Sequence, residues 1–341
     1  MAKRKLSKQQ QRRISSQQKS KINKEVLRAD EIDADESGSM VARVISHHGK
    51  QLYAEAETAE NKYQKIKCKI RQNLGEIACG DLVIVQQASN STGESQNVVV
   101  AVKERTNLLE KTGFAGAVKP VAANIGQLVI VTSLKPKPNP YLIDRYLASA
   151  ENLHAKALIV INKIDLMDHE TKPMVDELTA LYEDIGYPVI GASMKQEIGL
   201  EALSEALSHT TSILVGLSGV GKSSIVKKIL PKEEIKIGHT SKATGEGKHT
   251  TTVSALYHLK DNGIIIDSPG VRDFTPNSNS ISEITNGFID VRKFNGCCKF
   301  TNCSHLNEPG CAMKQAVSDG QLHQQRFNNY LRMIQEFNDK E

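Results

Sequence analysis

The chain has 341 residues, of which 39% are hydrophobic and 24% charged, ordinary fractions for a globular protein with a sizeable core. No apolar run approaches the roughly 20 residues of a transmembrane helix, and the N-terminus lacks the apolar stretch of a secretory signal. These features argue against a membrane-spanning or secreted protein and predict a cytoplasmic one. In that compartment the six cysteines favour a metal site over disulfides.

The N-terminus is polar and strongly basic. Residues 1–28 contain ten Lys or Arg and one Glu, a charge of +9, which leaves −4 for the rest of the +5 chain. Because so few apolar residues cannot form a core, residues 1–37 are predicted to be a disordered tail. The tail either binds nucleic acid phosphates or is a solvated segment that aids solubility, and we favour nucleic acid.

Residues 38–110 show the pattern of a small β-barrel. The expected strands are Val41–Ile45, Gln51–Glu57, Lys65–Arg71, Leu82–Gln86 and Val98–Lys103. Five short strands suit a barrel of the OB type, with Cys68 and Cys79 in its core.

The third of these strands has a basic face. Its side chains alternate between Lys65, Lys67, Lys69 and Arg71 on one side and Ile66, Cys68 and Ile70 on the other. The basic side either contacts RNA or is simply solvated, and we favour RNA. Since only Tyr53 and Tyr63 could stack on bases here, contact with a folded RNA fits better than binding of single strands.

Residues 111–280 alternate between strands and helices, which predicts a mainly parallel, doubly wound sheet covered on both faces. The expected strands are Gln127–Thr132, Ala157–Ile161, Pro188–Gly191, Ser212–Val215, Val253–Leu259 and Ile264–Ile266, with helices from Asn139-Pro140 and over residues 171–185, 199–208 and 222–230. Residues 281–341 contain four cysteines and end in an expected helix near 321–337. This last segment is predicted to be a zinc-binding helical module.

Gly216 to Ser223 reads G-L-S-G-V-G-K-S, the phosphate-binding pattern G-x4-G-K-S/T, between an apolar strand and a helical stretch. The glycines let backbone N–H groups curl around phosphates at the start of a helix. Lys222 is expected to neutralise the β- and γ-phosphates, and Ser223 to bind Mg²⁺. The candidate phosphate-binding residues are Gly216, Gly219, Gly221, Lys222, Ser223 and Ser224.

Two further segments are typical of nucleotide switches. An apolar strand ends in the D-x-P-G motif, in which Asp267 is expected to hold Mg²⁺ through water and Gly270 to sense the γ-phosphate. Before it, the segment G-K-H-T-T-T offers Thr250 and Thr251 as ligands of Mg²⁺ and the γ-phosphate, and we favour Thr251.

Another apolar strand ends in N-K-x-D, at Asn162, Lys163 and Asp165. A carboxylate can accept from the adjacent N1–H and N2–H₂ groups of guanine, whereas adenine would leave Asp165 unpaired and desolvated. Asn162 is expected to steady the base edge and Lys163 to cover a face of the ring. Ser193, at the end of the next strand, is the candidate that faces guanine O6.

The order of these motifs is unusual. Most GTPases run from the phosphate-binding loop through the switch threonine and D-x-P-G to N-K-x-D, whereas this chain begins with N-K-x-D. Doubly wound sheets tolerate relocated termini, because the chain ends tend to lie close together. The order therefore predicts a circularly permuted GTPase domain.

Cys298, Cys303, His305 and Cys311 follow the pattern C-x4-C-x-H-x5-C. Three thiolates and one imidazole suit a tetrahedral Zn²⁺ ion with no open position, which indicates a structural site. Spacing leaves Cys297 open as an alternative first ligand.

These features together resemble the ribosome small-subunit-dependent GTPase family (RsgA, also called YjeQ). The resemblance covers about residues 38–336 and includes the barrel, the permuted motif order and the segments GKHTTT, DSPG and CKFTNCSHLNEPGC. It implies GTP or GDP, Mg²⁺ and one Zn²⁺ ion per chain. It also implies that the protein binds the small ribosomal subunit and its rRNA during late maturation, and that the subunit stimulates GTP hydrolysis.

The chain departs from the family at two places. Gly126 stands where the family usually has an acidic residue, and the basic tail is not a general family feature.

The residue after D-x-P-G is Val271, an apolar side chain that cannot orient water. Intrinsic hydrolysis is therefore expected to be slow, with a water-positioning group supplied either by the ribosome or by the first switch segment. His249 is the candidate catalytic group beside Lys222 and Thr251, and its alternative is a solvated loop histidine.

Two other functions stay open at this point. The chain could be an RNA-binding module that uses GTP for occupancy with negligible turnover, or a GTPase for another RNA or translation partner. We expect a monomer that does not bind membranes.

Overall fold

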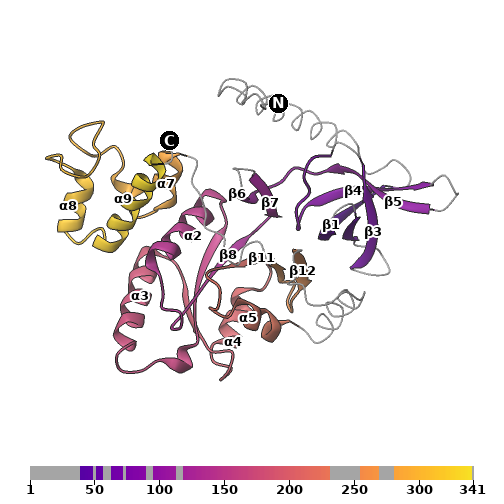
Figure 1. Cartoon of the computed structure of the whole chain (residues 1–341), viewed down its shortest axis with the longest axis horizontal. Helices are drawn as coiled ribbons and strands as arrows, with labels where there is room; N and C mark the ends of the chain where they lie inside the picture. Colours follow the sequence, from indigo (N-terminus) through magenta and orange to yellow (C-terminus); the bar gives the residue numbers. More distant parts are fainter. Residues whose placement is uncertain are drawn as a thin grey trace, which may run out of the picture. The chain divides into compact units, whose positions relative to one another are not determined.

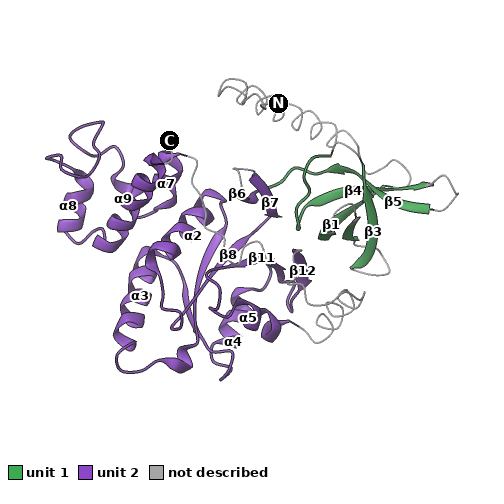
Figure 2. Cartoon of the chain, viewed as in Figure 1, with its two compact units in different colours: residues 1–106 green, residues 107–341 purple. Residues whose placement is uncertain are grey.

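The computed structural model describes residues 39–48, 51–56, 63–71, 74–89, 95–112, 118–230, 254–268 and 280–339. The chain divides into two units, residues 1–106 and residues 107–341 (Figure 2), and each is described by itself. None of the helices in these described ranges has the length and apolar character needed to span a bilayer.

The first unit is a closed five-stranded barrel (Figure 1). Its strands are β1 (Ser39–His48), β2 (Gln51–Ala56), β3 (Gln64–Ile70), β4 (Leu82–Ser89) and β5 (Ser95–Val102). They pair in the order β1-β2-β3-β5-β4, and β4 pairs again with β1. Only β3 and β5 run parallel among these pairs. The expected OB-like barrel is confirmed.

Strand β3 alternates as its sequence predicts. Lys65, Lys67 and Lys69 are exposed, whereas Ile66 and Cys68 are buried in the barrel core. Burial raises the pKa of the Cys68 thiol to about 11, as expected of an inert core cysteine. The outer face of β3 is therefore basic.

The second unit contains a six-stranded sheet in the order β10-β9-β8-β11-β13-β12. Its strands are β8 (Gln127–Ser133), β9 (Lys156–Asn162), β10 (Val189–Ala192), β11 (Thr211–Val215), β12 (Ala255–His258) and β13 (Ile264–Asp267). All pairs are parallel except β12–β13 at one edge. Every residue of β8 is buried, as expected of a strand covered on both faces.

The helices of this domain lie close to their predicted positions. They are α2 (Pro140–Asn152), α3 (Lys172–Ile185), α4 (Leu200–Ala206) and α5 (Lys222–Ile229). The side chain of Asn139 accepts from the Leu142 N–H and caps α2, with Pro140 in the first turn.

A separate hairpin was not predicted. Strands β6 (Leu108–Thr112) and β7 (Val118–Ala123) pair antiparallel in a sheet of their own, at the start of the second unit. Both strands are short and only partly buried, so the sequence carries no strong alternation there.

The C-terminal residues pack against helix α2. Their elements are α7 (Ile281–Gly287), the 3₁₀ turn η4 (Arg292–Phe294), α8 (Ala312–Ser318) and α9 (Gln324–Asn338). One apolar cluster joins Phe288, Phe327 and Tyr330 of this segment with Tyr141 and Ala148 of α2.

A buried ion cluster lies at the same junction. The guanidinium of Arg326, from α9, donates to Asp144 of α2 at 2.7 Å and to Asp290 at 2.7 and 3.1 Å. Tyr182 and Asn329 also donate to the Asp144 carboxylate, at 2.8 and 2.6 Å. Arg326 and Asp144 are both fully buried. Removing either side chain would therefore leave the other as a buried charge without its ion-pair partner.

Candidate nucleotide and metal sites

The loop from β11 to α5 adopts a conformation that only glycine allows. Gly216 and Gly221 have φ values of 135° and 101°. A Cβ atom on Gly216 would lie 2.1 Å from the Val131 carbonyl oxygen. The Lys222 ammonium is buried and donates to the carbonyls of Gly216 at 2.6 Å and Leu217 at 2.7 Å. A cation is thus held inside a glycine loop at a helix N-terminus, the arrangement that suits a phosphate.

The N-K-x-D motif contacts this loop directly. Asn162 ends β9 and donates from Nδ2 to the Val220 carbonyl at 2.8 Å. Lys163, in the left-handed region at φ 63°, donates from Nζ to the carbonyls of Gly219 (2.6 Å) and Lys135. Two motifs that are well separated in the sequence therefore form one site.

Ser193 orients the acidic residue of that motif. Its hydroxyl donates to Asp165 Oδ1 at 2.6 Å and accepts from the Gln196 N–H at 3.1 Å. Ser193 is fully buried, and its contact with guanine O6 stays a prediction. The Ser193 hydroxyl donates to Oδ1 of Asp165 and not to the other carboxylate oxygen, Oδ2.

A pocket of about 580 Å³ joins the two motifs. Its size suits a small-molecule ligand. The lining residues are Asn162, Lys163, Asp165, Leu166, Met194, Lys195, Gly221, Ser224, Lys227 and Lys228. Four lysines around one carboxylate favour a polyanionic ligand that also offers N–H donors.

A buried acceptor faces the same region. Asn162 is 2% exposed, and its Oδ1 atom has no hydrogen-bond partner among the described residues. A buried amide oxygen is costly to leave unpaired, and a ligand or water can complete it.

The remaining predicted residues lie at the same sheet edge or outside the described ranges. Asp267 is the last residue of β13, and Ser223 is the second residue of α5, the helix after β11. Both therefore lie at the carboxyl ends of neighbouring parallel strands. His249, Thr250, Thr251 and Gly270 lie outside the described residues.

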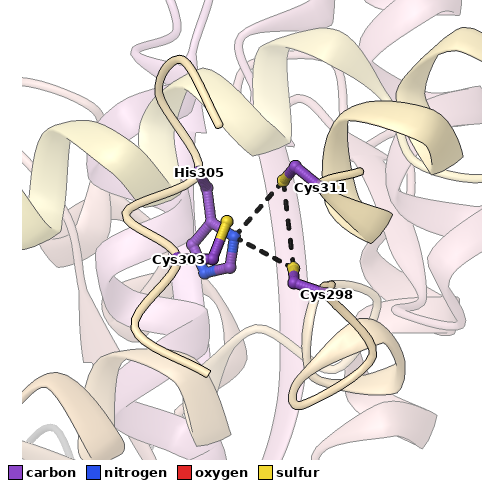
Figure 3. Close-up of side chains that lie close together, drawn as sticks. All are labelled: Cys298, Cys303, His305 and Cys311. Carbon is purple, nitrogen blue, oxygen red and sulfur yellow. Dashed lines mark hydrogen bonds between the residues drawn. The ribbon is translucent and has the colours of Figure 1, made fainter. Parts of the chain in front are cut away.

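The four predicted metal ligands converge in the C-terminal segment (Figure 3). Their ligand atoms all lie within 4.8 Å of one another. His305 Nδ1 is 3.6 Å from the Cys298 sulfur and 3.4 Å from that of Cys311, and these two sulfurs are 4.0 Å apart. Tetrahedral zinc bonds give about 3.6 Å for nitrogen to sulfur and about 3.8 Å for sulfur to sulfur, so the four residues fit Zn²⁺.

Cys297 stands apart from this cluster. Its exposed sulfur lies near the carbonyl oxygens of Lys293 and Asn295, at 4.0 and 3.8 Å. The alternative that spacing left open is therefore resolved in favour of Cys298.

Comparison with known proteins agrees with this geometry. The RsgA GTPase family model matches residues 102–277. The Saccharophagus degradans protein named "Small ribosomal subunit biogenesis GTPase RsgA" is 41% identical, over 99% of this chain and 98% of its own length. The chain belongs to the RsgA GTPase family.

Two solved structures share the fold of this RsgA family member. YjeQ from Thermotoga maritima has a TM-score of 0.69 at 31% identity, over 88% of this chain and 98% of its own. YloQ, described as a circularly permuted GTPase, has a TM-score of 0.69 at 28% identity, over 91% of this chain and 98% of its own. The permuted order expected from the motifs is thus found in a structural neighbour.

Some residues that line this pocket were not predicted from the sequence. Lys195 follows Ser193 by two positions, and Lys227 and Lys228 lie one turn beyond Ser224 on α5. Their proximity to known motifs was the available signal, because residues three and four apart share a helix face.

Proposed function

We propose that this GTPase binds the small ribosomal subunit and its rRNA in the cytoplasm and acts in late maturation of that subunit. In this proposal it hydrolyses GTP to GDP and phosphate, and the subunit raises the rate. The observation that carries the proposal is the single pocket that joins the N-K-x-D motif to the phosphate-binding loop. The ribosomal partner rests on the relatives, which are named small ribosomal subunit biogenesis GTPases.

Hydrogen-bond chemistry explains how this site would recognise guanine. Asp165 accepts from guanine N1–H and N2–H₂, while Ser193 holds the carboxylate in place. Asn162 and Lys163 fix the base-binding loop against the phosphate-binding loop. A purine without those donors would leave the Asp165 carboxylate with Ser193 but without its partners on the base, which discriminates against ATP.

The phosphate end uses the loop at the start of α5. Lys222 faces the β- and γ-phosphates, and backbone N–H groups of the loop surround them. The Mg²⁺ ligands are Ser223, Thr251 and Asp267, with Thr250 as the alternative threonine and Gly270 at the γ-phosphate. His249 positions the attacking water, since Val271 cannot.

The RNA contact follows from the basic face of β3. Lys65, Lys67 and Lys69 are all exposed on one side of the barrel, and Tyr53 lies opposite Lys67 on β2. Phosphates of a folded RNA would pair with such a face through charge and shape.

Cosedimentation with purified small subunits tests this proposal. The protein should pellet with small subunits in the presence of a non-hydrolysable GTP analogue, and much less with GDP. Replacing Lys65, Lys67 and Lys69 together by Gln should weaken binding at least tenfold. It should also reduce the slope of log affinity against log salt concentration by about one unit per lysine. Lys172→Gln, on the exposed face of α3, is the matched control.

Two results of this experiment would contradict different parts of the proposal. Equal binding to small and large subunits would remove the proposed partner. Unchanged binding of the triple variant would leave the partner in place but assign the RNA contact to another surface.

A further inference from the structure

The segment between His305 and Cys311 is organised by one carboxylate. Glu308 Oε1 accepts from the backbone N–H and the hydroxyl of Ser304, at 2.9 and 2.5 Å. Its Oε2 accepts from the backbone N–H groups of Leu306 and Asn307, at 3.2 and 3.1 Å. Both oxygens of a single side chain therefore accept from four donor groups, which belong to three residues of the segment from Ser304 to Asn307.

These donors flank a metal ligand in a strained conformation. His305 has φ 64°, the left-handed region that non-glycine residues rarely adopt. Such backbone costs about 1–3 kcal/mol and persists only where its surroundings enforce it. The residues on either side of His305 are Ser304 and Leu306, and both donate to Glu308.

Glu308 is not itself a member of the ligand set. Among the described residues, the converging cluster consists of three cysteines and His305, which completes a tetrahedral zinc site without a carboxylate. The hydrogen bonds from Ser304 hold the pKa of Glu308 at about 2, so it remains an acceptor throughout the pH range of the cell.

We propose that Glu308 is a positioning residue of the metal site: it clamps the turn that directs the His305 imidazole toward the cysteine sulfurs. The role resembles that of outer-shell carboxylates around other zinc sites, except that this one acts through the backbone on both sides of the ligand. The simpler alternative is a surface carboxylate that stabilises the loop without affecting the metal.

The variant Glu308→Gln distinguishes a positioning role at the metal site from a role in loop stability alone. The amide keeps the size of the side chain, but its NH₂ group would face N–H donors and cannot accept from them. After removal of metal with a chelator and reconstitution under reducing conditions, the zinc affinity of the variant should fall about 10–100-fold in competition with a chromophoric chelator. The absorption bands of the Co²⁺-substituted protein should also change, because the geometry of the His305 ligand changes.

Two further variants complete the test. Ser304→Ala removes one donor but keeps the carboxylate, so it should fold and lower zinc affinity in the same direction by a smaller factor. Glu177→Gln, exposed on α3, should match the wild type. GDP affinity should be unchanged in all three variants, which shows that the GTPase domain is intact.

The proposal fails if Glu308→Gln binds zinc within about twofold of the wild type and gives the same Co²⁺ spectrum. If Glu308→Gln does not fold, an unchanged zinc affinity of Ser304→Ala overturns the proposal and a reduced one supports it.

Discussion

Replacing Lys222 by Ala is expected to lower GTP affinity by about 10²–10⁴-fold and to abolish hydrolysis. The ammonium is buried inside the glycine loop, where it is already held by the carbonyls of Gly216 and Leu217. Two charge-assisted hydrogen bonds to phosphate oxygens contribute roughly 1.5–3 kcal/mol each, which gives this range. Titration with a fluorescent GTP analogue measures the affinity directly.

The control for this change is Lys172→Ala. Lys172 is an exposed lysine of α3 whose ion pair with Asp176 is worth only a few tenths of a kcal/mol. It should bind GTP like the wild type. If Lys222→Ala retained GTP affinity within about threefold, Lys222 would not face the phosphates.

The second large effect concerns stability. Replacing Arg326 by Leu should destabilise the second unit by about 3–5 kcal/mol, because it leaves Asp144 and Asp290 buried without their cation. For a unit of this size, such a loss lowers the unfolding temperature by roughly 6–20 °C. Scanning calorimetry of the full chain measures the shift.

The pH dependence of stability identifies the cause of the destabilisation in Arg326→Leu. Burial raises the pKa of Asp144, and the positive charge of Arg326 opposes this rise. In Arg326→Leu the folded-state pKa of Asp144 lies still further above its unfolded value. Stability from such a group is present at low pH and lost as pH rises through the folded pKa. The deficit of the variant should therefore be smaller at pH 5 than at pH 7.

Arg332→Leu provides the matched control in the same helix. Its side chain is 60% exposed, with an ion pair to Glu336 and a contact with the Tyr141 ring, so its loss should be at most about 1 kcal/mol. Equal effects of the two replacements, or a deficit of Arg326→Leu that does not change with pH, would contradict the buried-charge explanation.

Much of the nucleotide site could be predicted because each motif adjoins a strongly apolar strand. β9 is buried at every position but the first and ends at Asn162, and β11 leads directly into the glycine loop. Parallel strands place their carboxyl ends at one edge of the sheet, which brings such motifs together. Ser193 was predicted at this edge of the sheet, as the residue that faces guanine O6. Its hydrogen bond to Asp165 was not predicted, because it depends on a side-chain orientation that the sequence does not specify.

Long-range contacts of charged residues were beyond prediction. An arginine in a helix such as α9 reads as a surface residue, and Arg326 is buried only because Asp144 and Asp290 meet it from distant parts of the chain. The choice of Cys298 over Cys297 likewise depends on which way adjacent side chains point. Neither hydrophobic periodicity nor motif spacing contains this information.

The most direct test of the account is GTP hydrolysis measured with and without purified small ribosomal subunits. Large subunits and ATP serve as negative controls, Lys222→Ala as the blank, and His249→Ala as the probe of the water-positioning group. The account predicts slow intrinsic hydrolysis, strong stimulation by small subunits alone, and loss of that stimulation in His249→Ala. A wild-type rate that small subunits leave unchanged would contradict the proposed ribosomal role.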